Sequence, residues 1–311
     1  MKSKITIGTR SSKLALWQAN FVQEELQKLF PDIEIRLKEI KTKGDHITNV
    51  ALSKIGGKGL FTKEIEDELL KNKIDVAVHS LKDLPTKLPT GLKIGAVLKR
   101  ELPNDVLIST GGKKFNELPS KSKVGTSSLR RIAQLKSIRP DIIYLDLRGN
   151  LDTRIRKLEE GKYDAIVAAY AGVKRLGFEK LITEHFSPEE ILPAVGQGSL
   201  AIETRETDKE TNDIVLKLNH KETFLISLVE RAFLEFLQGG CQVPIGAYSK
   251  IRNNKIIMTG IIASLDGEKI VKDTILASLD IKTAKFVGKK LGQRLLHLGG
   301  KEILEGIIRT S

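Results

Sequence analysis

The chain has 311 residues, 40% of them hydrophobic and 29% charged, with a formal net charge of +13. This length allows two or three domains and a large core. The single cysteine excludes an internal disulfide, and no apolar run of about 18 residues could span a membrane. Without a signal or transit pattern at the N-terminus, a cytoplasmic protein is expected.

The positive charge first suggests a nucleic-acid binder. Aromatic residues, however, make up only 5% of the sequence, and no helical pattern combines a dense basic face with aromatic side chains. Many lysines fit solvated helix faces. Several arginines instead stand at predicted strand ends and helix starts, which suits a small polyanion better than a duplex.

Two pairs of segments echo each other along the chain. Residues 4–18 and 122–135 both read as a short apolar strand, then Gly-Thr, then serines that open a helix. Residues 67–80 and 156–169 both read as a helix end, an aspartate and a buried strand. The order of elements predicts two α/β lobes of similar plan with mostly parallel sheets. Residues 141–147, DIIYLDL, are one of the expected continuous apolar strands.

The lobes are expected to meet near Glu101–Asp105 and Pro193–Glu203, where Gly196 and Gly198 form either a hinge or a plain turn. From about Lys221 an amphipathic helix ends at glycines. Three strands follow, separated by turns at Asn253-Asn254 and Asp266-Gly267, and then a final helix. These elements predict a third, smaller α+β domain.

Hydroxyl side chains open a helix in both lobes, within residues 8–12 and 125–128. Free N–H groups and the helix dipole favour an anion there, although ordinary capping explains most such serines. Arg10 lies at one of these junctions. Arg130 and Arg131 lie in the first turn of the other helix, where their charge opposes the dipole. Either a bound anion or a salt bridge would offset this repulsion.

Three more arginines follow predicted strands: Arg148, Arg154 and Arg175. Ligands of open parallel sheets bind beyond the carboxyl ends of the strands. Guanidinium groups bind carboxylates through paired hydrogen bonds. Each arginine alone could form a surface ion pair, but together they predict a ligand with several carboxylates or phosphates.

The stretch VAVHSLKDLP places Ser80 at a strand end, with Lys82 and Asp83 in the loop that follows. A carboxylate among arginines stays ionised near neutral pH and could stabilise a cation or transfer protons. The alternative is a simple turn aspartate. His79 reads as a core residue. The five histidines show no metal-binding spacing, so no metal is expected.

Two features remain open from the residues alone. Glycine-rich residues 41–61 predict a mobile loop or lid, without a phosphate-binding or dinucleotide motif. Cys241 follows two glycines and precedes Pro244 in an accessible loop. A lone cysteine is usually a small buried hydrophobe. No histidine stands in a pattern that would make this one a hydrolytic nucleophile.

These motifs resemble the porphobilinogen deaminase (hydroxymethylbilane synthase) family. The matching stretches are IGTRSSKLALWQA, IGGKGLFTKEIE, DVAVHSLKDLPT, VGTSSLRRIAQL, LRGNLDTRIRKL, AVGQGSLAIE and GGCQVPIGA. They cover nearly the whole chain in the family's order, and VHSLKDLP together with GGCQVPIGA is very specific. Val173 stands where the family pattern leads us to expect leucine, a conservative departure.

The resemblance implies two lobes of clamshell, periplasmic-binding-protein-like plan and a small C-terminal α+β domain. The implied domains are residues 1–100 with 200–218, residues 101–199, and residues 219–311. Cys241 would hold a dipyrromethane cofactor through a thioether. The enzyme would then add four porphobilinogen molecules in sequence. Each addition loses ammonia and gives a cation that the terminal pyrrole of the chain attacks, and water finally releases hydroxymethylbilane.

The same resemblance implies roles for individual residues. Asp83 would be catalytic, and Lys54, Lys58 and Phe61 would belong to the mobile loop. Cofactor and substrate would be bound by Arg10, Ser12, Ser80, Lys82, Thr126, Ser127, Ser128, Arg130, Arg131, Arg148, Arg154, Arg175 and Gln197. A cytoplasmic monomer that binds neither nucleic acid nor membranes is expected. The rival classes, a non-catalytic anion-binding clamshell protein and a basic nucleic-acid binder, both predict an unmodified Cys241.

Overall fold

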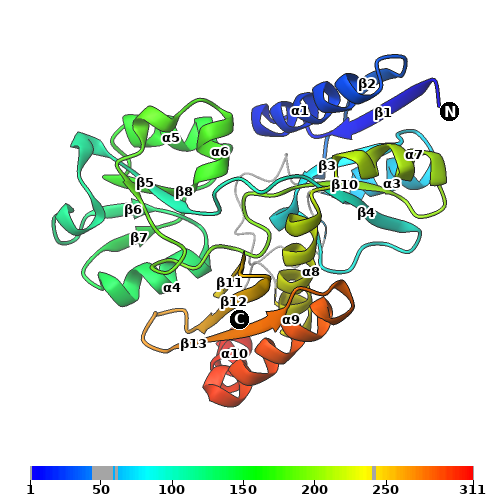
Figure 1. Cartoon of the computed structure of the whole chain (residues 1–311). Coiled ribbons are helices and arrows are strands. Elements are labelled where there is room, and N and C mark those ends of the chain that lie inside the picture. Colours follow the sequence, from blue (N-terminus) through cyan, green and yellow to red (C-terminus); the bar gives the residue numbers. More distant parts are fainter. Residues whose placement is uncertain (1, 44–58, 60–61, 240–242, 311) are drawn as a thin grey trace. The chain divides into compact units, whose positions relative to one another are not determined.

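A computed structural model describes residues 2–43, 59, 62–239 and 243–310 (Figure 1). The chain divides into two compact units. The first contains residues Met1–Glu101 and Gly198–Phe224, and the second contains Leu102–Gln197 and Leu225–Ser311.

The first unit is built on a five-stranded sheet with the order β2-β1-β3-β10-β4. Its strands are β1 (Lys4–Thr9), β2 (Glu34–Glu39), β3 (Val76–Ser80), β4 (Leu92–Val97) and β10 (Leu200–Arg205). Strand β1 pairs in parallel with β2 and β3, whereas β10 runs antiparallel to β3 and β4. The helices of this unit are α1 (Lys13–Leu29), α3 (Lys63–Leu70) and α7 (Lys209–Val215).

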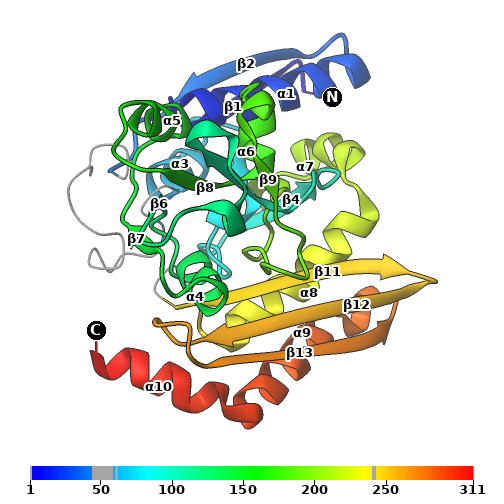
Figure 2. The same ribbon diagram turned by 90° about the vertical axis from the view of Figure 1, so that its left-hand side faces the viewer.

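The second unit repeats this plan in the order β7-β6-β8-β5-β9. Strands β6, β7, β8 and β9 of this sheet are labelled in Figure 2. Its strands are β5 (Asp105–Ser109), β6 (Lys123–Gly125), β7 (Ile143–Leu145), β8 (Ala165–Ala169) and β9 (Glu184–His185). Strand β6 is parallel to β7 and β8, and β5 is antiparallel to β8 and β9. The accompanying helices are α4 (Leu129–Ile138), α5 (Leu151–Glu159) and α6 (Tyr170–Arg175). Each sheet thus has its antiparallel strand in the fourth position, and the predicted repetition is confirmed.

The repetition extends to single contacts. The Asp75 carboxylate accepts a hydrogen bond from Thr6 N at 2.8 Å, and the Asp164 carboxylate accepts one from Lys123 N at 2.7 Å. In each sheet, the aspartate just before the strand in third position (β3 or β8) therefore accepts a hydrogen bond from the backbone of the strand in second position (β1 or β6). A side chain at Gly125 would meet the Tyr163 ring at 2.8 Å, because the residue before the aspartate lies across that strand.

Strand β7 differs from the expected continuous strand in residues 141–147. It spans only three residues at the sheet edge, and Ile143 is 42% exposed there. Ile142 and Leu147 are buried, but they lie outside the strand. An edge strand needs only one partner, so a short pairing is enough to hold the apolar side chains in place.

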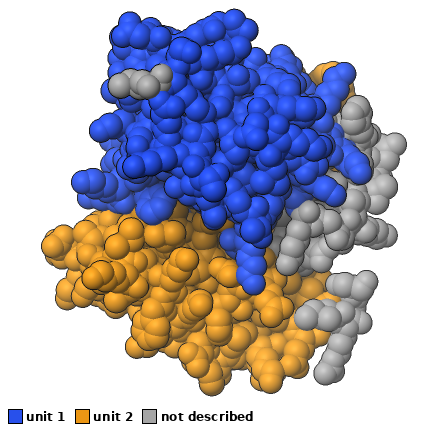
Figure 3. Space-filling model, turned by 90° about the vertical axis from the view of Figure 1, so that its right-hand side faces the viewer, with its two compact units in different colours: residues 1–101, 198–224 blue, residues 102–197, 225–311 orange. Residues whose placement is uncertain are grey.

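The second unit also contains most of the C-terminal segment, whose boundary with the first unit falls between residues 224 and 225 (Figure 3). The segment consists of α8 (Lys221–Phe236), the antiparallel strands β11 (Ile245–Arg252), β12 (Lys255–Ala263) and β13 (Ile270–Ser278), and the helices α9 (Ile281–Leu295) and α10 (Lys301–Thr310). The three strands and the first two helices are confirmed, whereas α10 was not predicted. The division at residue 218 into a lobe and a C-terminal domain stays a prediction.

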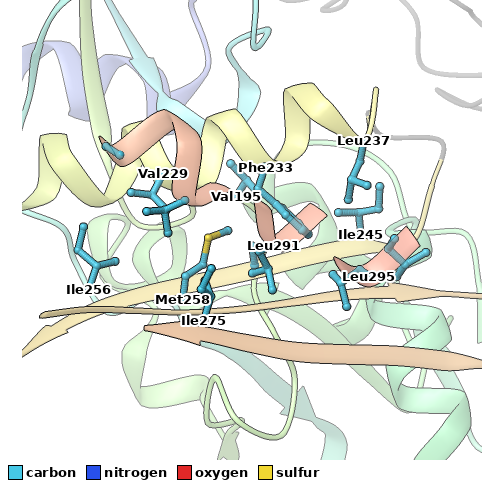
Figure 4. Packing of buried hydrophobic residues seen from close by; sticks show 14 of the residues in the cluster. Val195, Val229, Phe233, Leu237, Ile245, Ile256, Met258, Ile275, Leu291 and Leu295 are labelled. Carbon is cyan, nitrogen blue, oxygen red and sulfur yellow. The ribbon is translucent and has the colours of Figure 1, made fainter. Parts of the chain in front are cut away.

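Helices α8 and α9 and the three-stranded sheet enclose one apolar core (Figure 4). Phe233 and Val229 of α8 pack with Leu291 of α9 and Met258 of β12, all fully buried. Asn253 and Asn254 have φ values of 50° and 58°, as a two-residue hairpin turn requires. The turn therefore sets the register that brings β12 onto this core.

Gly288 of α9 provides a test of how closely the two helices pack. A methyl group at this position would lie 2.8 Å from Phe233 N and closer still to Val229 O, both backbone atoms of α8. Backbone cannot move aside as a side chain can, so we expect Gly288→Ala to lower the free energy of unfolding by about 1–3 kcal/mol or more.

Gly306 of α10 is the matched control, because a methyl group there meets nothing within 4 Å. Gly306→Ala should raise the free energy of unfolding by roughly 0.5–1 kcal/mol through helix propensity. Urea denaturation of both variants measures the two changes. Equal stabilities for Gly288→Ala and the wild type would contradict the close approach of α8 and α9.

Candidate functional site

A pocket of about 440 Å³, part of it open solvent, lies in the first unit at the carboxyl ends of β1 and β3. It brings together four of the predicted site residues, Arg10, Ser12, Ser80 and Asp83. Gln18 of α1 also lines it and donates a hydrogen bond to Ser80 Oγ at 2.8 Å. The sequence analysis missed Gln18, although its place two turns into the helix after the GTRSS segment was a usable signal.

Asp83 is presented by a short 3₁₀ turn, Leu81–Asp83. Leu81 and Leu84 are 1% and 5% exposed, and Leu81 N donates to Ser199 O at 3.0 Å. Lys82 and Asp83 between them are exposed. The two buried leucines of SLKDL therefore anchor the turn in the core and leave the two charged residues between them exposed.

A buried acid–imidazole cluster lies beside this pocket. His79, which lines the pocket, places Nε2 3.0 Å from Glu203 Oε2, and Glu203 is fully buried. Glu66 of α3 is 5% exposed, and burial raises its pKa, with a further contribution from the Glu203 charge. The burial predicted for His79 is confirmed. Its partners were missed because Glu203 is distant in sequence and only the sheet pairing brings it near.

In the second unit, hydroxyl residues connect the loops that follow β6 and β7. Ser127 Oγ donates to Leu147 O at 2.6 Å and accepts from Leu147 N at 3.1 Å. Thr126 N donates to Leu145 O at 2.9 Å. Ser128 caps α4 by accepting from Arg131 N at 3.4 Å, and Ser12 caps α1 in the same way. Both serines therefore act as ordinary N-terminal helix caps, which is one of the two possibilities that the sequence left open.

Three predicted arginines follow the carboxyl ends of β7 and β8, the two strands that pair with β6. Arg148 Nε donates to Asp146 Oδ2 at 2.9 Å, and Arg154 Nε of α5 donates to Gly149 O at 2.8 Å. Arg175 is the last residue of α6, the helix that follows β8. All three are partly exposed. Arg148 follows β7 at the same edge of the sheet as the hydroxyl residues, and Arg154 and Arg175 belong to the helices α5 and α6 that begin after β7 and β8.

Arg130 and Arg131 behave differently, because both are buried against Asp105. Arg130 Nη1 lies 2.8 Å from Asp105 Oδ2, and Arg131 Nη2 lies 2.7 Å from Oδ1. Burial alone would raise the pKa of Asp105, but the two guanidinium charges hold it well below its usual range. Burial lowers the pKa of Arg130. A salt bridge therefore offsets the repulsion of the helix dipole, one of the two alternatives left open by the sequence.

Gln197 is 1% exposed, and its amide donates to Pro103 O at 2.6 Å and to Asp105 Oδ1 at 2.9 Å. Its neighbours Gly196 and Gly198 have φ values of 72° and 90°, which favour glycine. Gly196 N donates to Glu230 Oε2 of α8 at 2.9 Å. This segment is thus fastened to both β5 and α8.

Cys241 and the loop residues Lys54, Lys58 and Phe61 lie outside the described residues. Within the described part of the chain, no group of three or more His, Cys, Asp or Glu side chains could hold a metal ion. No helix in that same part is long and apolar enough to cross a membrane.

The raised pKa of Glu66 predicts a pH-dependent stability. Protonated Glu66 contributes to the free energy of unfolding below its unfolded pKa of about 4.3. This contribution is lost as the pH rises through the higher pKa of the folded state, because a buried charge is then required. The free energy of unfolding of Glu66→Gln minus that of the wild type should therefore be larger at pH 8 than at pH 4.5. Free energies of unfolding in urea at the two pH values measure this difference.

Glu68 of the same helix is the control with the opposite sign. A hydrogen bond from Lys38 lowers the pKa of Glu68, so its contribution to stability is lost as the pH falls. The free energy of unfolding of Glu68→Gln should consequently fall further below that of the wild type at pH 8 than at pH 4.5. A pH-independent difference between Glu66→Gln and the wild type would show that Glu66 is not strained by its burial.

Comparison with known proteins gives a consistent picture. Residues 5–213 match the family model described as the dipyromethane cofactor binding domain of porphobilinogen deaminase, and residues 224–297 match the model of its C-terminal domain. A porphobilinogen deaminase from Carboxydothermus hydrogenoformans is 52% identical over 100% of this chain and 99% of its own. One from Desulforamulus reducens is 48% identical over 99% of both chains.

Among solved structures, a probable amino-acid transporter extracellular-binding protein from Bacillus subtilis superposes with a TM-score of 0.40 and 13% identity, over 70% of this chain and 90% of that one. The two family models together span most of the sequence, and relatives about half identical extend over its full length. The chain belongs to the porphobilinogen deaminase family of tetrapyrrole biosynthesis.

Proposed function

We propose that the chain is a transferase that polymerises four porphobilinogen molecules on a dipyrromethane primer held by Cys241, and then releases hydroxymethylbilane by hydrolysis. The observation that carries this proposal is the pocket that places Asp83 together with Arg10, Ser12 and Ser80. Family membership supplies the reaction class. We further propose that the protein is a monomer and that it is located in the cytoplasm.

Asp83 is the proposed catalytic group. Its exposed carboxylate at the pocket lies where a substrate pyrrole could approach, and the buried leucines on either side fix its position. A fixed negative charge stabilises the cation that forms when ammonia leaves porphobilinogen. The same carboxylate can hydrogen-bond the pyrrole N–H and transfer protons.

Porphobilinogen carries acetate and propionate arms, so its binding requires cations and hydroxyl donors. In the first unit these are Arg10 and Ser12, with Lys82 beside Asp83. Gln18 and Ser80 form a hydrogen-bonded pair on the pocket wall. We assign the carboxylate arms of the incoming monomer to this set, because guanidinium and hydroxyl groups are good partners for carboxylates.

The residues of the second unit fit a dipyrromethane group chemically, because that group also carries several carboxylates. Its arms would be bound by Thr126, Ser127, Ser128, Arg130, Arg131, Arg148, Arg154 and Arg175. When bound, the group supplies a nucleophilic pyrrole carbon. The protein's part is to hold the carboxylates in place and to keep the charge of the growing chain compensated.

The position of Arg130 supports this assignment. A methyl group at Gly246 would lie 3.2 Å from Arg130 Cδ and 3.0 Å from Leu192 O, so the arginine stem runs directly alongside β11. That strand begins four residues after Cys241 in the sequence. We also propose that Gln197 takes part in binding cofactor or substrate, and that Lys54, Lys58 and Phe61 belong to a mobile loop.

Asp83→Asn tests the catalytic role. We expect turnover to fall by roughly 10²–10⁴-fold, because the carboxylate is lost while the size of the side chain is kept. Intact mass should show that the cofactor is still attached. Asp32→Asn, an exposed aspartate outside the pocket, is the control and should turn over normally. Near-normal turnover of Asp83→Asn would remove the catalytic assignment.

Intact-mass measurement with peptide mapping tests the role of Cys241. The purified protein should exceed the mass of its sequence by two linked pyrrole units, located on the Cys241 peptide. Cys241→Ala should fold and carry no such adduct. A bare mass that persists after incubation with porphobilinogen would favour a non-catalytic anion binder, and an adduct in Cys241→Ala would place the attachment elsewhere.

A further inference from the structure

We infer that Asp105 is a positioning residue for the ligand-binding arginines, holding Arg130 and Arg131 in fixed orientations and joining them to the two segments by which the chain passes between its units. The inference rests on the proposed function, in which these arginines bind carboxylates.

Both carboxylate oxygens of Asp105 contact neighbouring side chains. Oδ2 lies 2.8 Å from Arg130 Nη1, and Oδ1 accepts from Arg131 Nη2 at 2.7 Å and from Gln197 Nε2 at 2.9 Å. Asp105 is fully buried, and the arginines are 5% and 6% exposed. One carboxylate thus compensates one of two guanidinium charges, and one positive charge remains for a ligand.

Each guanidinium group also donates a hydrogen bond to a backbone carbonyl. Arg130 Nη1 donates to Leu192 O at 2.6 Å, and Arg131 Nη1 donates to Val167 O of β8 at 3.0 Å. Both contacts of Arg130 use Nη1, whereas Arg131 is held through two different nitrogens. A planar group fixed at two atoms has its remaining N–H directions determined, so Arg131 is the more firmly oriented of the two. Arg131 Nε is buried without a hydrogen-bond partner among the described residues. Buried donors are nearly always satisfied, so this atom indicates where a ligand carboxylate would bind.

Asp105 and Gln197 lie close in sequence to the two points, residues 101/102 and 197/198, at which the chain leaves one unit and enters the other. Asp105 follows the first of these points and Gln197 precedes the second. The Gln197 amide bridges Asp105 to Pro103 O, at 2.9 and 2.6 Å. The arginines, the start of β5 and both connecting segments therefore belong to one hydrogen-bonded cluster.

Two roles of Asp105 predict opposite effects of removing its charge. If Asp105 served only to neutralise buried cations, Asp105→Asn would leave the site more positive, and polyanion binding would tighten or stay unchanged. If Asp105 positions the guanidinium groups, the same substitution releases them from each other and from Gln197. Ligand binding then weakens in spite of the added positive charge.

The experiment compares holoenzymes of Asp105→Asn and Asp75→Asn, assayed below both unfolding temperatures. Asp75 is the matched control, a carboxylate that lies 2.6 Å from Lys2 and 3.4 Å from Arg205 and does not line the pocket. We expect Asp105→Asn to raise KM for porphobilinogen roughly tenfold or more, or to lower cofactor loading by intact mass. Asp75→Asn should lower Tm and leave KM and loading unchanged.

An unchanged or lower KM with full loading in Asp105→Asn would overturn the inference. If that variant does not fold, Gln197→Met, which removes only the amide bridge, is judged by the same criterion. Arg131→Ala distinguishes the ligand role of the arginine from the positioning role of Asp105. Normal kinetics and loading in Arg131→Ala would refute the ligand role of the arginine, whereas impaired Arg131→Ala with normal Asp105→Asn would refute only the positioning role.

Discussion

A buried carboxylate between two guanidinium groups is the constraint on which the second unit depends. Arg130 and Arg131 begin a helix whose dipole repels them, and Asp105 is the group that makes this placement tolerable. Buried ion pairs rarely stabilise more than apolar packing of equal volume would. Their use here is orientation: the cluster fixes α4, β5 and the 192–197 segment together and keeps an excess positive charge at the sheet edge.

The two units carry different charged groups at corresponding edges of sheets that share one plan. In the first, the carboxyl edge presents an exposed aspartate held by buried leucines, beside a pocket with one arginine. In the second, the corresponding edge carries several arginines and a carboxylate that is buried instead of exposed. Under the proposed function, Asp83 would stabilise the cation, and the arginines of the second unit would bind the carboxylates of the cofactor.

The sequence was most informative where the physical cause is local. Gly-Thr followed by serine identified both helix starts, and the aspartates at 75 and 164 showed the repeat because each bonds a neighbouring strand in the same register. Asp105 gave no such signal, since its partners lie far along the chain. The same holds for His79 and Glu203, which only the pairing of β3 with β10 brings together. The short β7 reflects its place at a sheet edge, which no property of its own residues reveals.

The place of β10 has a consequence for biosynthesis. It lies between β3 and β4, yet it is made about a hundred residues after β4. All five strands of the other sheet fall within residues 105–185. As the chain emerges from the ribosome, all strands of the second sheet can therefore pair before β10 is available to pair with β4. The lobe that begins the sequence is finished later than the one that interrupts it, and a chaperone would meet its open edge during that interval.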